Sequence, residues 1–181
     1  TYNDYEHQEL EGGEIGTTFE QNAFDVRANL DHGEIAGWRG TIGAQYVDMD
    51  FNAFGAEAFV PNADTRQLAL FVFEKRDFGA LALELGARAE NQRIDVDAAL
   101  PDYDETAYSV SAGTVWTLSE SYSTALNVTR SQRHPQSAEL YANGPHLAIA
   151  RFEIGAQDLD KETASTIDIT LHRHGQRGLH W

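Results

Sequence analysis

Apolar and polar residues alternate along most of the chain with a period of two. In residues 17–31, Phe24, Val26 and Leu30 share one face of an extended chain, and Asp25 and Arg27 lie on the other. A β-strand with one apolar face requires this period, whereas an amphipathic helix repeats every 3.6 residues. The pattern predicts strands at residues 1–10, 17–31, 38–53, 65–75, 80–97, 106–118 and 122–133, and a last one that includes 166–172. We therefore predict an all-β, antiparallel protein of about eight strands.

The expected connections alternate between short and long ones. The short turns fall near residues 32–37 (centred on His32–Glu34), 76–79 and 119–121, and the longer connections at 11–16, 54–64, 98–105 and 134–161. Most of the expected strands reach the 9–11 residues that a tilted strand needs to cross a bilayer, whereas globular strands cluster around ~5–6 residues. Outer-membrane barrels have short periplasmic turns and long extracellular loops. The pattern thus predicts an up-and-down transmembrane β-barrel segment whose longer connections are extracellular.

Composition excludes several classes of protein. The 181 residues include no cysteine, so a disulfide framework or thiolate metal site is not possible. The formal net charge of −16 argues against nucleic-acid binding, which needs a basic surface. The sequence contains no nucleophile elbow of the Gly-x-Ser-x-Gly type and no phosphate-binding loop, and we predict that the protein is not an enzyme.

The two ends of the chain also carry an expectation. The sequence has no run of about 18 apolar residues and no signal peptide at its start. It begins within a strand-like pattern. We therefore interpret residues 1–181 as an internal fragment of a longer protein.

The stretch Thr129–Thr163 contains a connection too long for a hairpin turn. It includes Pro135 and Pro145, and Ser137–Ala142 could form one helical turn with Ser137 as its cap. A connection of this length is usually functional or disordered, and this one is too rich in Leu, Tyr, Phe and Ile for a solvated linker. We expect it to be folded and functional.

Histidines in the expected extracellular segments are candidate metal ligands. They are His7, His134 and His146, and histidine suits zinc, with carboxylates able to complete the coordination shell. No two of them have a local ligand spacing such as His-x₃-His. The alternative is structural: His146 would hydrogen-bond the turn after Pro145, and His134 would end a strand before Pro135.

Several separated motifs resemble those of TonB-dependent outer-membrane receptors. Near the C-terminal end they are Arg133-His-Pro, Glu139-Leu-Tyr-Ala-Asn-Gly-Pro-His-Leu-Ala, Phe152-Glu-Ile-Gly and Leu159-x-Lys-Glu-Thr. Near the start they are Tyr2-Asn-Asp-Tyr-Glu-His-Gln-Glu-Leu-Glu-Gly, Gly16-Thr-Thr-Phe and Gly37-Trp-Arg-Gly-Thr-Ile-Gly-Ala-Gln-Tyr46. They appear in the order found in the family. The resemblance is closest to the proteobacterial branch that includes zinc and haem importers.

This resemblance implies a fold and a function. Residues 1–181 would be part of a barrel of about 22 strands, the size of plugged outer-membrane transporters, and would lack the plug domain. The protein would sit in the outer membrane, in contact with lipid and lipopolysaccharide. It would take up a scarce nutrient, a metal ion or metal chelate such as zinc, haem or a siderophore, energised by the TonB–ExbB–ExbD complex. No cofactor is required, because zinc or haem iron would be cargo. Glu139, Tyr141 and His146 are the expected substrate contacts in the extracellular loop.

A second hypothesis needs no larger barrel. Eight strands can close a small barrel by themselves, and alternation also fits a β-sandwich. Residues 1–181 would then form a self-contained adhesion or binding module.

Overall fold

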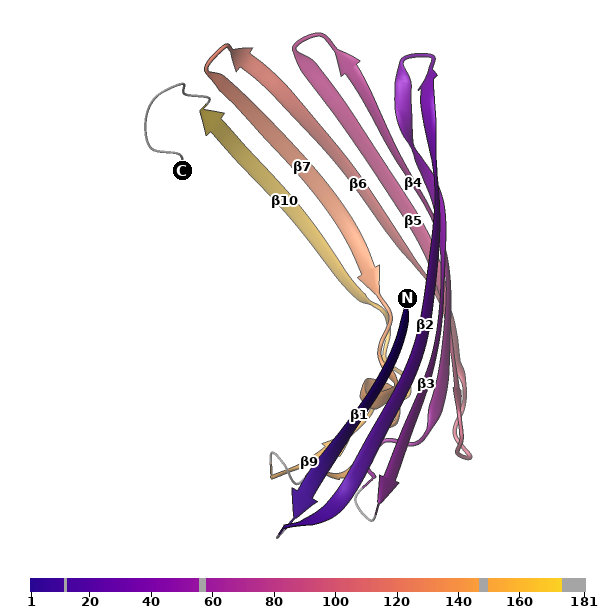
Figure 1. Cartoon of the computed structure of the whole chain (residues 1–181). Coiled ribbons are helices and arrows are strands. Elements are labelled where there is room, and N and C mark those ends of the chain that lie inside the picture. The colour runs from indigo at the N-terminus through magenta and orange to yellow at the C-terminus, as the bar shows by residue number, and fades with distance from the viewer. Residues whose placement is uncertain (12, 56–57, 147–149, 174–181) are drawn as a thin grey trace.

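A computed structural model of the chain describes residues 1–11, 13–55, 58–146 and 150–173. Its main body is one antiparallel sheet of eight strands, in the order β1-β2-β3-β4-β5-β6-β7-β10 (Figure 1). These strands are β1 (Tyr2–Glu11), β2 (Glu14–Ile35), β3 (Trp38–Gly55), β4 (Ala63–Phe78), β5 (Leu81–Val96), β6 (Tyr103–Ser119), β7 (Tyr122–Arg133) and β10 (Glu162–Arg173). Each strand pairs with its neighbours along the chain, so the predicted all-β, up-and-down topology is confirmed.

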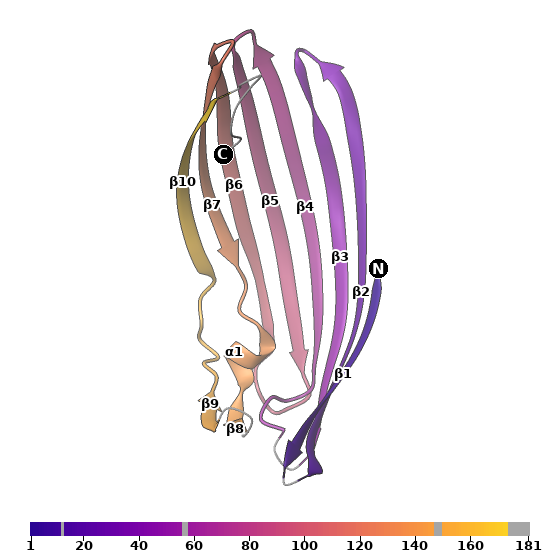
Figure 2. The ribbon, with the colours of Figure 1, turned by 60° about the vertical axis from the view of Figure 1, so that its left-hand side comes forward.

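Three short elements connect β7 to β10. They are helix α1 (Ser137–Tyr141) and a small antiparallel pair of strands, β8 (Asn143–His146) and β9 (Arg151–Ile154). They lie at the end of the sheet opposite the short turns, which is the lower end of Figure 2. No helix in the described part of the chain is long and apolar enough to cross a membrane.

The register collects the alternating apolar residues on one face of the sheet. Tyr46 pairs with Val26 on one side and with Leu68 on the other, and Ala89 lies opposite Leu70 and Tyr108. This apolar face carries large side chains that are exposed, and they include Phe24, Val26, Leu30, Ile42, Tyr46, Leu68, Leu70, Tyr108, Val110, Leu126, Val128, Ile167 and Ile169. Soluble monomers rarely expose so large a contiguous apolar surface. It is the surface that an outer-membrane barrel turns towards lipid.

Charged residues bound the apolar face on the side of the long connections. Asp48, Arg66, Arg93 and Asp104 lie next to one another across four strands. On β4, the stretch from this row to the short turn has about the length that a strand needs to cross the hydrocarbon. The strands continue past the row, so in an outer-membrane barrel the end that carries the long connections would extend beyond the membrane.

The opposite face of the sheet is polar. Arg88 donates hydrogen bonds to Gln45 and Glu90, and Gln45 in turn donates to the Asp25 carboxylate at 3.1 Å. Lys75 donates to Glu84 at 2.9 Å. A wet barrel lumen permits such a network, and we take this polar face as the lumen face.

Phe71 is an exception on the lumen face. Its ring covers Gly43 of the neighbouring strand, where an added Cβ would lie 2.1 Å from the ring. The Arg27 guanidinium lies 4.3 Å from the centre of the same ring. This packing explains why β4 is apolar on both faces at its centre.

Three of the predicted turns were placed wrongly. β2 continues through His32 to Ile35, and the chain reverses at Ala36 and Gly37, both with positive φ (53° and 83°). A two-residue hairpin of type I′ has this geometry, so Gly33 did not mark the turn. The expected long connection at 11–16 is instead a tight hairpin in which Glu11 pairs with Glu14. The expected loop at 98–105 is shorter, since β6 begins at Tyr103.

The sheet is open among the described residues. β1 and β10 are its two outer strands, and they do not pair with each other in the part of the chain that the structure describes. Figure 1 shows the sheet as a curved wall rather than a closed cylinder. This geometry fits a segment of a larger barrel.

Candidate functional site

The connection between β7 and β10 folds onto the lumen face. Its buried residue Leu140 packs with Ala63, Ile94 and Tyr103, which belong to β4, β5 and β6. Leu140 and Ile94 are 1% and 0% exposed. We call residues 134–146 and 150–161 the mouth segment, because they lie at the end of the lumen face that carries the long connections.

Local chemistry explains the short helix at the start of the mouth segment. Gln136 is the N-cap of α1, and its backbone N–H donates to the Glu139 carboxylate at 2.8 Å. A glutamate at the third helical position that reaches back to the cap is one half of a capping box. The helix predicted at Ser137–Ala142 is confirmed, but the expected cap, Ser137, is wrong by one position.

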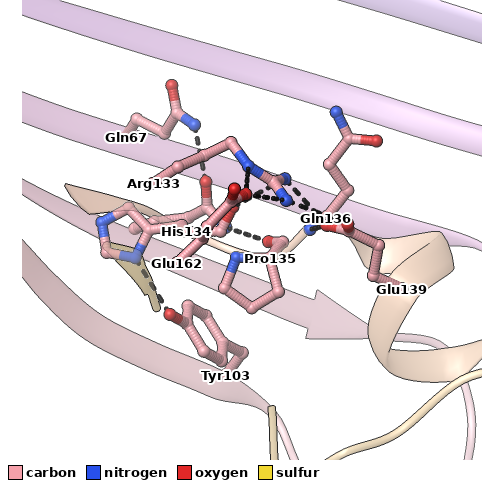
Figure 3. Close-up of polar contacts among 9 residues, drawn as sticks. Gln67, Tyr103, Arg133, His134, Pro135, Gln136, Glu139 and Glu162 are labelled. Carbon is pink, nitrogen blue, oxygen red and sulfur yellow. Dashed lines mark hydrogen bonds and ion pairs between the residues drawn. The ribbon is translucent and has the colours of Figure 1, made fainter. Parts of the chain in front are cut away.

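Arg133 closes the base of the mouth segment (Figure 3). Its two terminal nitrogens donate to the two Glu139 oxygens at 2.9 and 3.0 Å, and its Nε donates to Glu162 at 3.0 Å. A bidentate arginine–carboxylate pair fixes geometry as well as adding energy. Hydrogen bonding from Arg133, and then from the Gln136 backbone, holds the pKa of Glu139 below its usual value. The end of β7, the start of α1 and the start of β10 are thereby held together.

Next to Arg133, His134 is buried and both of its ring nitrogens are engaged. Nε2 lies 3.0 Å from the backbone oxygen of Glu90, and Nδ1 lies 2.9 Å from the Tyr103 hydroxyl. A carbonyl only accepts, so Nε2 carries the proton and Nδ1 accepts from the tyrosine. Burial raises the pKa of Tyr103 to about 12, with a smaller contribution from Glu105, which keeps the hydroxyl protonated as the donor. His134 therefore attaches the mouth segment to the wall.

A chain of amides adds a second attachment. Gln67 donates to Gln92 at 2.6 Å, and Gln92 donates to the backbone oxygen of Pro135 at 2.9 Å. Gln92 is 4% exposed, so this polar side chain needs such partners. Figure 3 shows Gln67 and Pro135 beside the Arg133 group.

Two further contacts hold parts of the mouth segment against the wall and against α1. The Tyr141 hydroxyl donates to the backbone oxygen of Pro101 at 2.9 Å, and this side chain is buried. Gly155 lies so close to α1 that an added Cβ would be 2.6 Å from the Leu140 carbonyl carbon. The backbone N–H of Gly155 also donates to the Ala142 oxygen at 2.6 Å. The chain just after β9 is thus held in contact with α1.

His146 lies between two carboxylates at the tip of the hairpin formed by β8 and β9. Its Nδ1 is 2.9 Å from Glu153, and its Nε2 is 3.3 Å from Glu9 of β1. Its ring stacks on Phe59 with 4.7 Å between ring centres. The mouth segment therefore contacts strands near both edges of the sheet.

A series of aromatic rings continues from Phe59 towards His7. The ring centre of Phe59 lies 6.1 Å from that of Phe19, and the ring centre of Phe19 lies 6.2 Å from that of His7. The His7 ring stacks on Tyr5 with 6.5 Å between ring centres. Tyr5 is 53% exposed. We call Tyr5, His7, Glu9, Phe19, Phe59, His146 and Glu153 the mouth cluster.

The structure therefore separates the residues that the sequence singled out. His7 and His146 belong to the mouth cluster, with Phe19 and Phe59 between them, whereas His134 lies apart and is held by Tyr103. Within the described residues, no three His, Cys, Asp or Glu side chains are grouped so as to hold a metal ion. Glu139 and Tyr141 are engaged within the mouth segment and with the wall.

Several residues of this site could not be identified from the sequence. They include Arg133 as the clamp, Phe59 as the ring beneath His146, and Glu9 as the partner of His146. Arg133 was included in a motif, but nothing in the sequence pairs it with Glu139 and Glu162. Phe59 falls in a connection with no regular pattern. Only the folded chain brings these residues together.

Comparison with protein families gives a match over almost the whole chain. The family model described as "TonB dependent receptor-like, beta-barrel" matches residues 1–180. The match confirms the resemblance to TonB-dependent receptors that the motifs indicated. The placement in the zinc and haem importer branch stays a prediction.

Proposed function

The chain belongs to the TonB-dependent receptor β-barrel family, and on this premise we propose that it forms part of the receptor for a metal chelate. Family membership gives TonB-dependent transport across the outer membrane. The substrate is our inference. Among the candidate substrates, we favour haem or a ferric siderophore over zinc.

The mouth cluster is the observation that supports this proposal. It combines two histidines, two carboxylates and three other aromatic rings on the lumen side, at the end that the barrel rule places outside the cell. The His146 side chain is 24% exposed, so it is reachable from the lumen. Substrate entering the barrel from outside would meet this cluster first.

The form of the substrate follows from the spacing within the cluster. Zinc needs ligand atoms at about 2 Å from the ion, and the rings of Phe19 and Phe59 keep His7 away from His146. Tyr5 is the exposed aromatic ring of the cluster, and a ring of this kind favours flat or aromatic ligands, which it contacts by stacking. A chelate that presents an organic surface fits the cluster better than a bare ion.

In this proposal, His146 and His7 contact the substrate, while Glu139 and Tyr141 act by holding the mouth segment in place. Glu139 is bound to Arg133, and Tyr141 is bound to Pro101. Both would affect affinity through the position of His146. His134 would act in the same way through Tyr103.

Substrate binding by the full receptor tests the proposal. Haem, a ferric siderophore and zinc are titrated separately into wild-type protein and the variant His146→Ala. Asn143→Ala is the matched control, because Asn143 is an exposed residue of the same hairpin. We expect His146→Ala to weaken binding of one chelate by at least about tenfold, or ~1.4 kcal/mol, and Asn143→Ala to leave it unchanged. Equal affinities of His146→Ala and wild type for all three ligands would refute the proposal.

A further inference from the structure

A groove lies on the apolar face at the opposite end of the sheet from the mouth cluster, beside the turn between β2 and β3. It has a volume of about 560 Å³ and is lined by His32, Ile35, Trp38, Ile42, Glu74 and Leu85. Four of these six residues are apolar. Because the groove is on the face that meets lipid, its occupant comes from the membrane.

A hydrogen-bonded pair of polar side chains, His32 and Glu74, forms one wall of this groove. His32 Nε2 lies 2.9 Å from Glu74 Oε1, and the carboxylate lies against Gly40. Any side chain at Gly40 would collide with it, since an added Cβ would lie 2.8 Å from Glu74 Oε2. Charged side chains on a lipid-facing surface are costly unless paired, so the pair adds a polar wall with little net charge.

Arg76 lies beside the groove and carries an unpaired charge. Its guanidinium carbon lies 5.7 Å from the centre of the Trp38 ring and 4.8 Å from that of Phe78. Within the described residues Arg76 makes no ion pair, whereas nearby Arg39 is paired with Asp77. An arginine held between aromatic rings at the border of an apolar surface is positioned to bind an anion at the level of lipid headgroups.

We propose that this groove and Arg76 form a binding site for one glycerophospholipid of the periplasmic leaflet. The lipid phosphate would pair with the Arg76 guanidinium, and an acyl chain would lie in the groove along Ile42 and Leu85. The negative phosphate complements the positive Arg76 guanidinium, and the nearby Glu74 carboxylate is hydrogen-bonded to His32. The inference rests on the outer-membrane placement given by the family and is independent of the proposed substrate.

The order of the residues supports this orientation of the lipid. Arg76 and Phe78 are near the short turn of β4, and Ile42 pairs with Val72, further into the apolar face. A lipid whose phosphate is at Arg76 therefore directs its acyl chains towards the middle of the membrane. Short turns are periplasmic in this class of barrel, which gives the leaflet.

Native mass spectrometry of the full receptor, purified in a mild detergent, tests the site with phosphatidylglycerol as the probe. Wild type is expected to retain one lipid, and Arg76→Gln to retain it with about tenfold lower affinity, because the charge-assisted contact is lost. Arg130→Gln is the matched control, since Arg130 is an exposed arginine that lies next to Val110 on the same face. The control is expected to bind lipid as wild type does.

A second variant keeps the proposal testable if Arg76→Gln does not fold. Ile42→Trp fills the groove and leaves Arg76 in place, and it is expected to lower retention to a similar degree. Heat-modifiability on a gel reports folding of each barrel. Equal retention by wild type and either folded groove variant, or equal loss in Arg130→Gln, would overturn the site. Chelate binding by the same samples is expected to be unchanged. A failure of the lipid site would therefore leave the proposed function standing, and the reverse holds as well.

Discussion

Replacing Leu140 by alanine tests whether the mouth segment is held against the lumen face by packing. Leu140 is 1% exposed and contacts Ala63, Ile94 and Tyr103, residues from three strands of the wall. Truncating a buried leucine to alanine costs about 2–5 kcal/mol when the cavity cannot collapse. The wall strands are held by their own ladders and should not move. The cost therefore falls on the docking of the mouth segment.

Hydrogen exchange measures this docking. In the full receptor, the amides of Leu140, Ala142 and Gly155 are hydrogen-bonded only while the segment is folded. A loss of 2 kcal/mol in the free energy of opening corresponds to an exchange rate about 30-fold higher. We expect at least this increase for peptides that cover residues 136–156, with β4 and β5 unchanged.

Leu159→Ala is the control, because Leu159 belongs to the same segment but is 42% exposed. A surface truncation of this kind should alter the opening free energy by no more than about 0.5 kcal/mol. If Leu140→Ala exchanges as slowly as Leu159→Ala, the segment is not held by the core described here, and the site must be reconsidered.

Two further outcomes follow from the geometry of the mouth segment. Gly155→Ala places a Cβ 2.6 Å from the Leu140 carbonyl carbon and is expected to cost about 1–3 kcal/mol, seen as faster proteolysis of the segment than in a Gly33→Ala control, where an added Cβ meets nothing within 4 Å. The pKa of Glu139 is lowered in the fold, so its stabilising effect is complete above the usual glutamate pKa of about 4.3 and is lost as pH falls through the lower, folded value. A spin label attached at Ser137→Cys should become more mobile on acidification. This response should be absent in Arg133→Gln, where the label should already be mobile at neutral pH. If Arg133→Gln responds to acid as the unmodified sequence does, the role of the Arg133–Glu139 pair is contradicted.

Most of the strands were predictable because they share one physical requirement. A strand that crosses the membrane needs an apolar side towards lipid, and this need produces the alternation seen at Phe24, Val26 and Leu30 or at Ile167 and Ile169. β1 differs, because Asp4, Glu6 and Gln8 lie on the corresponding face. The turn at Ala36 and Gly37 was misplaced because Gly33 resembles a turn residue, while the ladder between β2 and β3 continues past it. Local turn signals were thus overridden by pairing.

The position of the mouth segment could not be predicted from the sequence. Its helix could be predicted from local residues, but its inward direction depends on Ile94 and Tyr103, which lie some forty residues earlier. His134 was a candidate ligand because histidine binds metals, and only the positions of Tyr103 and Glu90 show that both ring nitrogens are engaged. Contacts between residues that are so far apart along the chain leave no periodic pattern in the sequence.

Uptake by cells is the most direct test of the central claim that this barrel segment belongs to a TonB-dependent importer of a metal chelate. The full receptor is expressed in outer membranes of cells with and without TonB, and radiolabelled haem, ferric siderophore and zinc are supplied at limiting concentration. We expect accumulation of one chelate that requires both TonB and His146, while binding at the cell surface persists without TonB. Accumulation of none of the three, or accumulation that is equal without TonB, would contradict it.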